Sequence, residues 1–167
     1  MKVSAIIRLV AIPAVLILFF SGCNMQTEDS ESRTDKLDFY LGADLSYVNE
    51  MQDCGAVYRD SEGDTVDPYM LFSASGANLV RLRLWHSPSW TSYANFADVR
   101  KGIQRAKADG MHVLLDFHYS DTWADPAHQL IPSAWEDAAE NLELLADSVY
   151  NSTYQTLNDL ATENLLP

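Results

Sequence analysis

Near the middle of its length the chain carries the run Leu79-Val80-Arg81-Leu82-Arg83-Leu84-Trp85. Aliphatic side chains alternate along this run with arginine and tryptophan side chains, with a period of two, which predicts a half-buried β-strand. Its two faces are Val80, Leu82 and Leu84 on one side and Arg81, Arg83 and Trp85 on the other. The aliphatic face must pack on helices, so the arginines point away from them. Burying a guanidinium is costly unless it meets a carboxylate or a ligand, and this face is therefore a candidate site.

Two further strands are predicted, at residues 39–45 and 111–119. The second of them also alternates, with Val113, Leu115 and Phe117 on one face and His112, Leu114, Asp116 and His118 on the other. Helices are expected at 68–75 and 95–108, each followed by a glycine. A last helix ends near residue 161 and begins either at the capping-box pair Ser133 and Glu136 or nearer Glu143. The order β-α-β-α-β-α predicts a parallel sheet with right-handed crossovers.

Polar groups gather at the carboxyl ends of these strands, the edge of a parallel α/β fold at which substrates bind. The segment His118-Tyr119-Ser120-Asp121-Thr122-Trp123 that follows the third strand is dense in hydrogen-bonding and aromatic groups. Sugars need both, because they present hydroxyl groups at the rim and an apolar C–H face. Trp85, Trp90 and Trp123 are candidate platforms, with core packing or loop anchoring as the alternative for each.

A metal site is the second interpretation of the same segment. His and carboxylate ligands suit Zn, Mn or Fe, and the candidates here are Asp116, His118, Asp121, Asp125 and His128. Neither an H-E-x-x-H spacing nor a cysteine pair supports this interpretation.

Composition excludes several other classes of protein. The 167 residues carry a formal net charge of −13, which argues against nucleic-acid binding, since phosphate contacts require basic patches. Two cysteines cannot form a dense disulfide framework. Cys54 is expected to be a buried small hydrophobe.

The N-terminus has the features of an exported lipoprotein. Residues 1–22 combine Lys2 and Arg8 with an apolar run too short to span a membrane, which indicates a signal peptide. The last residues before Cys23 resemble a bacterial lipobox, so we expect cleavage there and a lipid on the Cys23 thiol. Removal of the two basic residues would change the net charge from −13 to −15. Residues 23–38 then form a polar tether, and Asn24 is compatible with sorting to the outer membrane.

Three stretches resemble glycoside hydrolase family 53, the arabinogalactan endo-β-1,4-galactanases. They are Gly42-Ala43-Asp44-Leu45-Ser46, the run from Gly76 to Trp85, and Asp116-Phe117-His118-Tyr119-Ser120-Asp121-Thr122-Trp123-Ala124-Asp125-Pro126 with Trp135 downstream. The resemblance implies a (β/α)8 TIM barrel. It also implies hydrolysis of β-1,4-galactan, the side chain of type I arabinogalactan and pectin, with retention of configuration.

The resemblance also implies roles for individual residues. Arg81 would hold the nucleophilic glutamate ionised, since an opposite charge lowers the pKa of a carboxyl group. His118 would be a hydrogen-bond partner near the reacting groups and not the acid itself. The positions expected to line or brace the cleft are Asp44, Arg81, Arg83, Trp85, Asp116, His118, Tyr119, Asp121 and Trp123. No cofactor is implied; a structural calcium occurs in some bacterial relatives, but no ligands for it can be assigned in this sequence.

In the family, the acid/base glutamate lies at the end of strand four and the nucleophile on strand seven, so both are expected beyond Pro167. The sequence therefore predicts the N-terminal three βα units of a barrel, truncated before strand 4 and inactive alone, since a barrel needs eight units and about 250 residues. Residues 1–22 would be the signal peptide, 23–38 the lipidated Cys23 and tether, and 39–167 the partial barrel. Two alternatives are a lipid-anchored galactan-binding protein without catalysis and a metal-dependent hydrolase that uses Asp116 and His118.

Overall fold

The structure, a computed structural model, describes residues 39–166. The predicted signal peptide, Cys23 and the polar tether lie outside these residues. Within the described part, three strands form one parallel sheet in the order β1 (Gly42–Asp44), β2 (Leu79–Leu84) and β3 (His112–Phe117). Gly42 pairs with Leu79, and Leu79 in turn with His112, so the three strands start in register. The parallel sheet predicted from the sequence is confirmed, although each strand is shorter than expected.

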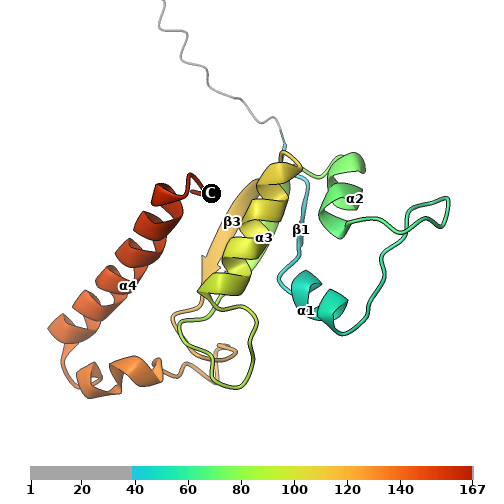
Figure 1. Cartoon of the computed structure of the whole chain (residues 1–167). Coiled ribbons are helices and arrows are strands. Elements are labelled where there is room, and N and C mark those ends of the chain that lie inside the picture. The colour runs from blue at the N-terminus through green and yellow to red at the C-terminus, as the bar shows by residue number, and fades with distance from the viewer. Residues whose placement is uncertain (1–38, 167) are drawn as a thin grey trace, which may run out of the picture. The chain divides into compact units, whose positions relative to one another are not determined.

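Five helical segments connect and flank the strands. They are α1 (Val48–Asp53), α2 (Pro68–Ala74), α3 (Phe96–Ala108), the 3-10 helix η1 (Ser133–Ala138) and α4 (Leu142–Thr162). In Figure 1, α3 lies in front of the sheet and runs alongside β3, and α4 stands on the β3 side. None of the helices among the described residues is long and apolar enough to cross a membrane.

Local hydrogen bonds explain where the helices begin. Asp67 accepts from the Tyr69 amide at 2.8 Å, with Pro68 in the first helical position of α2. Asn95 caps α3 by accepting from the Asp98 amide at 3.0 Å. Asn141 caps α4, so that helix begins near Glu143, as the second of the two expectations had it. The capping box at Ser133 does not form, because η1 has no side-chain cap and the Ser133 amide and hydroxyl both donate to Asp121 instead.

The core lies between the sheet and α3. Val80, Leu82 and Leu84 are all buried, as the period-two alternation predicts, and they cluster with residues of α3 that follow helical spacing, Val99, Ile103 and Ala106. Burying each Val, Leu or Ile side chain of this cluster contributes about 1.5–3 kcal/mol. Gly102 allows the close approach of α3, since a Cβ at that position would lie 3.0 Å from Leu82 Cδ1.

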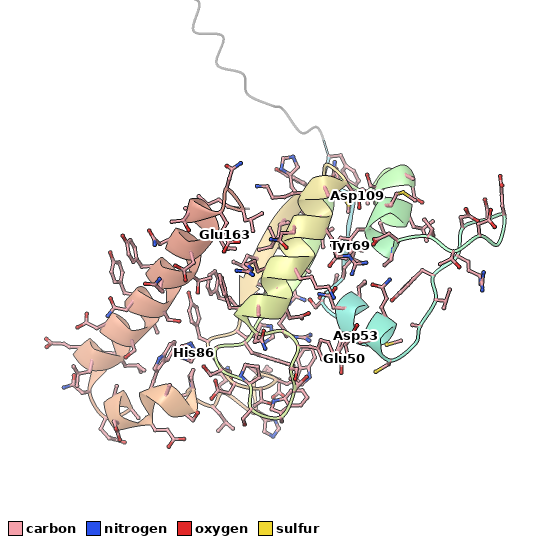
Figure 2. The ribbon with its side chains drawn as sticks, viewed as in Figure 1. Glu50, Asp53, Tyr69, His86, Asp109 and Glu163 are labelled. Atoms are coloured by element: carbon pink, nitrogen blue, oxygen red, sulfur yellow. The ribbon has the colours of Figure 1, made fainter. Side chains whose placement is uncertain are left out.

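Tyr69 extends this core between α2 and α3, where Figure 2 labels it. Its side chain is fully buried and its hydroxyl has no hydrogen-bond partner within the described residues. Burial disfavours the phenolate and raises the pKa of Tyr69 well above its ordinary value. The Arg105 guanidinium lies over the ring, 4.5 Å from its centroid.

Gly42 shows why β1 carries a glycine. A Cβ at this position would lie 2.3 Å from the carbonyl oxygen of Leu79 on the neighbouring strand. Only a residue without a side chain allows the two backbones to come this close.

The described sheet has two open edges, one at β1 and one at β3. Among the described strands β3 pairs only with β2, and Leu114 at its centre is 51% exposed on the face that points away from α3. α4 is tied to α3 through the pair Arg100–Glu163 at 3.0 Å, and its Leu160 belongs to the core cluster. Figure 2 shows Glu163 at the end of α4 that lies toward α3.

Candidate functional site

The site is built on an ion-pair bridge across the three strands. Arg81, in β2, donates through Nη1 to Asp44 Oδ2 at the end of β1 and through Nη2 to Asp116 Oδ2 in β3. Asp44 is the register partner of Arg81, and Asp116 is the partner of Arg83. The parallel pairing therefore brings one guanidinium between two carboxylates, which come from positions 72 residues apart in the sequence.

The surroundings of Asp44 favour its ionised form. Partial burial of Asp44 works against ionisation, but hydrogen bonds from Ser46 and the charge of Arg81 outweigh it and hold the pKa of Asp44 below its ordinary value. The Ser46 amide donates to Asp44 Oδ1 at 2.9 Å. All three charged side chains are partly exposed, between 30% and 41%, so the net stabilisation by each ion pair is about 1 kcal/mol or less. The arrangement fixes positions more than it stabilises the fold.

His118 extends the bridge toward the loop after β3. Its Nε2 lies 3.0 Å from Asp116 Oδ2, and its amide donates to the Leu84 carbonyl at 2.9 Å. The imidazole is 12% exposed, and its buried Nδ1 has no partner in the described part of the chain. Asp116 thus orients the ring through one nitrogen.

Aromatic rings surround the second arginine of β2. Arg83 Cζ lies 4.1 Å from the Trp123 ring centroid, 4.3 Å from that of Trp85 and 4.8 Å from that of Tyr47. Trp90 packs on Trp85 with ring centroids 5.0 Å apart. We call the four rings of Tyr47, Trp85, Trp90 and Trp123 the aromatic cluster. Trp85 is buried at its centre, whereas the other three rings are 46% to 59% exposed.

Asp121 holds the loops around this cluster. Its Oδ1 accepts from the Ser87 amide at 2.9 Å, and its Oδ2 accepts from the Ser133 amide and hydroxyl at 2.9 and 2.8 Å. Its backbone carbonyl accepts from Trp90 Nε1 at 3.0 Å. Partial burial opposes ionisation, but the bonds from Ser133 and Ser87 outweigh it and lower the pKa of Asp121. Asp121 therefore joins the β2–α3 loop to η1.

Tyr119 does not join the other candidate residues on the strand face. Its backbone has a φ of +45°, in the left-handed region that residues other than glycine and asparagine rarely adopt. The side chain runs toward α4, where its hydroxyl lies 2.8 Å from the Thr153 hydroxyl and its ring stacks on Phe117. It lines a pocket of about 500 Å³ that also includes His118, Trp135 and Val149.

His86 lies in the same region between the sheet and α4, where Figure 2 labels it. Its Nδ1 is 3.1 Å from the Ser152 hydroxyl, and its ring packs on Trp135 with centroids 4.5 Å apart. Burial lowers the pKa of His86.

The metal interpretation finds no support in the geometry. No group of three His, Cys, Asp or Glu side chains converges as a metal site within residues 39–166. Asp125 and His128 pair with each other in an exposed turn, with Nδ1 of His128 3.0 Å from Asp125 Oδ2. The hydrogen bonds from His128 and the Ala127 amide lower the pKa of Asp125. Asp116 is engaged by Arg81 and His118.

Two features were not predicted. Tyr47 contributes a ring to the aromatic cluster from the turn after β1, and its place directly behind Gly42-Ala43-Asp44-Leu45-Ser46 is the one sequence signal that pointed to it. Cys54, the C-cap residue of α1, is exposed, so the expectation that it is buried was wrong.

A family model for glycosyl hydrolase family 53 matches residues 40–167. The chain belongs to glycosyl hydrolase family 53. The match includes the strands, the ion-pair bridge and the aromatic cluster.

Two curated relatives of this chain are galactanases. An arabinogalactan endo-β-1,4-galactanase of Cellvibrio japonicus (strain Ueda107) is 55% identical over 133 residues, which are 80% of this chain and 35% of that protein. An endo-β-1,4-galactanase of Bacillus subtilis (strain 168) is 36% identical over 135 residues, 77% of this chain and 31% of that protein. The chain thus spans about a third of the length of the curated relatives it matches.

Solved structures agree with this family membership. A fungal β-1,4-galactanase superposes with a TM-score of 0.72 at 37% identity, covering 77% of this chain and 37% of that one. The family 53 catalytic domain of Ignisphaera aggregans gives a TM-score of 0.71 at 36% identity, covering 78% of this chain and 38% of that one. The three βα units are therefore the N-terminal part of a (β/α)8 TIM barrel, as the sequence predicted.

Proposed function

We propose that residues 40–167 are the substrate-holding part of an endo-acting, retaining glycosidase that hydrolyses β-1,4-galactan. The observation that carries this proposal is the pairing of exposed indole rings with an ordered row of charged groups across the three strands. Trp90 and Trp123 offer flat apolar surfaces for the C–H face of a sugar. The ion-pair bridge offers carboxylate oxygens and guanidinium donors for its hydroxyl groups. Membership of family 53 supports the choice of β-1,4-galactan among possible polysaccharides.

Within this proposal Asp44 and Asp116 orient other groups and do not react. Retaining hydrolysis uses two carboxyl groups about 5–5.5 Å apart on opposite sides of the scissile bond, one of which must be protonated to act as the acid. Asp44 and Asp116 instead share one guanidinium on a single side, and the pKa of Asp44 is held below its ordinary value, which favours its ionised form. The acid/base and the nucleophile are the two glutamates expected outside residues 1–167. Arg81 would orient the nucleophile and keep it ionised.

A chimera tests this function directly. Residues 40–167 would replace the matching segment of the Cellvibrio japonicus relative. The segment that they replace is 55% identical, so the rest of that protein already packs against a similar sequence. We expect the chimera to release reducing ends from linear β-1,4-galactan and to leave β-1,4-glucan intact. A folded chimera that cleaves β-1,4-glucan but not galactan contradicts the proposed substrate.

A binding protein without catalysis is the second candidate, favoured by the exposed rings of the aromatic cluster. The 167-residue chain alone distinguishes it. Retention on a galactan matrix with no reducing sugar released fits both a binding protein and an incomplete enzyme, and activity of the chimera then decides for the enzyme. Release of reducing sugar by the chain alone would show that residues 1–167 contain the reacting groups.

We further propose that the protein is an exported bacterial lipoprotein, held at the periplasmic or cell-surface face of the outer membrane by lipid on Cys23. The charged start, the short apolar run and the residues before Cys23 support this proposal. In a Gram-negative host, the wild-type chain should partition into detergent with a mass increase on Cys23. A Cys23→Ser variant should keep its signal peptide. Normal cleavage of that variant to a water-soluble product would contradict lipidation.

A further inference from the structure

Arg83 has an environment unlike that of the other arginine of β2. Its side chain is only 2% exposed, and three aromatic rings lie within 4.8 Å of Cζ. Arg81, two positions earlier, pairs with two carboxylates. Arg83 has no ion pair with any described residue, and its buried Nε has no hydrogen-bond partner there. A buried guanidinium without a carboxylate is costly, so its retention needs a reason other than a salt bridge.

The three rings that contact Arg83 come from the ends of three different strands. Tyr47 follows β1, Trp85 follows β2, and Trp123 lies in the loop after β3. Tyr47 and Trp123 approach each other with ring centroids 6.5 Å apart. One planar cation thus contacts side chains from three separate loops, each of which has its own backbone freedom.

The rings of Tyr47 and Trp123 remain open on their other sides. Each is 46% exposed although the guanidinium lies against it. Trp123 is further supported by Trp85, whose ring lies edge-on with centroids 5.4 Å apart. Two neighbouring rings are therefore backed by protein on one side and accessible on the other, as a surface that stacks on sugar requires.

We propose that Arg83 is a positioning residue for polysaccharide binding, which holds the rings of Tyr47 and Trp123 so that their exposed faces stack on the sugar chain. The proposal rests on the galactan-binding function proposed above and adds the residue that orients its platform. A guanidinium suits this role because it is planar, stays charged and stacks on ring faces. A lysine would place a compact, strongly hydrated charge in the same space and would not lie flat against three rings.

The first test measures ring positions without any sugar. In the full 167-residue chain, Arg83→Met removes the planar cation and keeps much of its volume. We expect acrylamide to quench tryptophan fluorescence more strongly than in the wild type, and the near-UV circular dichroism of the coupled indoles to weaken. Arg83→Lys should fall in between. Arg100→Met is the matched control, because it also removes an arginine, in this case one on α3 that pairs with Glu163. It should leave both signals unchanged.

The second test measures binding in the chimera. If Arg83 positions the platform, Arg83→Met should raise KM for β-1,4-galactan by roughly 5- to 30-fold, with kcat changed less than twofold. Arg83→Lys should recover part of the loss. A role limited to folding predicts instead a lower yield of active enzyme at unchanged KM.

The outcomes separate this inference from the proposed function. If the chimera hydrolyses galactan and Arg83→Met leaves KM unchanged, the inference is wrong and the galactanase function stands. If the chimera is folded and does not act on galactan, the galactanase proposal fails, and the quenching experiment alone decides whether Arg83 holds the rings. Equal quenching in wild type and Arg83→Met overturns the inference in either case.

Discussion

Removal of the Asp121 carboxylate should loosen the loops over the site and leave the strands in place. In Asp121→Ala, the Ser87 amide and the Ser133 amide and hydroxyl all lose their acceptor. Each such bond contributes about 1 kcal/mol net. Water can replace part of the loss because these groups lie near the surface, so we expect a total destabilisation of about 2 kcal/mol.

The pH dependence of this effect follows from the lowered pKa of Asp121. A carboxyl group whose pKa is lower in the folded than in the unfolded chain stabilises the fold above its unfolded pKa, and this stabilisation is lost as the pH falls through the folded value. The difference between wild type and Asp121→Ala should therefore be complete at pH 6 and should shrink below about pH 4.

Thermal melting of the chimera measures both effects. At pH 6 the variant should melt about 3–5 °C below the wild type, and the gap should narrow at pH 3. Asp137→Ala, in the exposed part of η1, is the matched control and should shift the melting temperature by less than 1 °C. The assignment of Asp121 as the link between the loops would be refuted if Asp121→Ala had the same melting temperature as the wild type at pH 6. It would also be refuted if Asp137→Ala lowered the melting temperature as much as Asp121→Ala.

Four further substitutions test the sheet and the bridge. Gly42→Ala should destabilise the fold by about 3 kcal/mol in urea unfolding, because its Cβ would overlap the Leu79 carbonyl; a loss below 1 kcal/mol contradicts this packing. Leu82→Ala should lower the free energy of unfolding by about 2–5 kcal/mol. Adding Gly102→Ala should restore part of this loss, because the new methyl group fills the cavity left by Leu82 and alanine favours the helix. A further loss in the double variant would show that the cavity closes by itself. In the chimera, Asp116→Asn should lower kcat/KM by up to about 100-fold. A mechanism-based inhibitor should leave no glycosyl adduct on Asp116 of the wild-type chimera, since an adduct there would make Asp116 the nucleophile.

The sequence predicted those features that depend on local periodicity. The alternation along residues 79–85 and 112–118 was enough to separate the faces of β2 and β3 correctly, because a strand alternates wherever its neighbours lie. The parallel sheet followed from the order of elements. The same reasoning fails where the strand ends: Tyr119 leaves the alternating pattern because its backbone enters the left-handed region and turns the ring toward α4.

Long-range contacts account for the rest. The short α1 has no side-chain cap of its own, and its Asn49 instead bonds Asp98 and Arg105, about 50 residues away. The predicted need of the arginines for carboxylates was met by Arg81 but not by Arg83, which is surrounded by rings. No pattern within a few residues of Arg83 indicates three rings supplied by three loops.

The open edge of β3 has a consequence for how such a protein is made. The amino-terminal third of a family 53 barrel leaves the ribosome first, and in a relative whose matched segment is 35% of its length most of the polypeptide is still to come. During that interval β3 offers unpaired backbone groups beside the half-exposed Leu114, which favours pairing with strands of other nascent chains. Translation speed after residue 117 and chaperone contact with this edge should therefore control the yield of folded barrels.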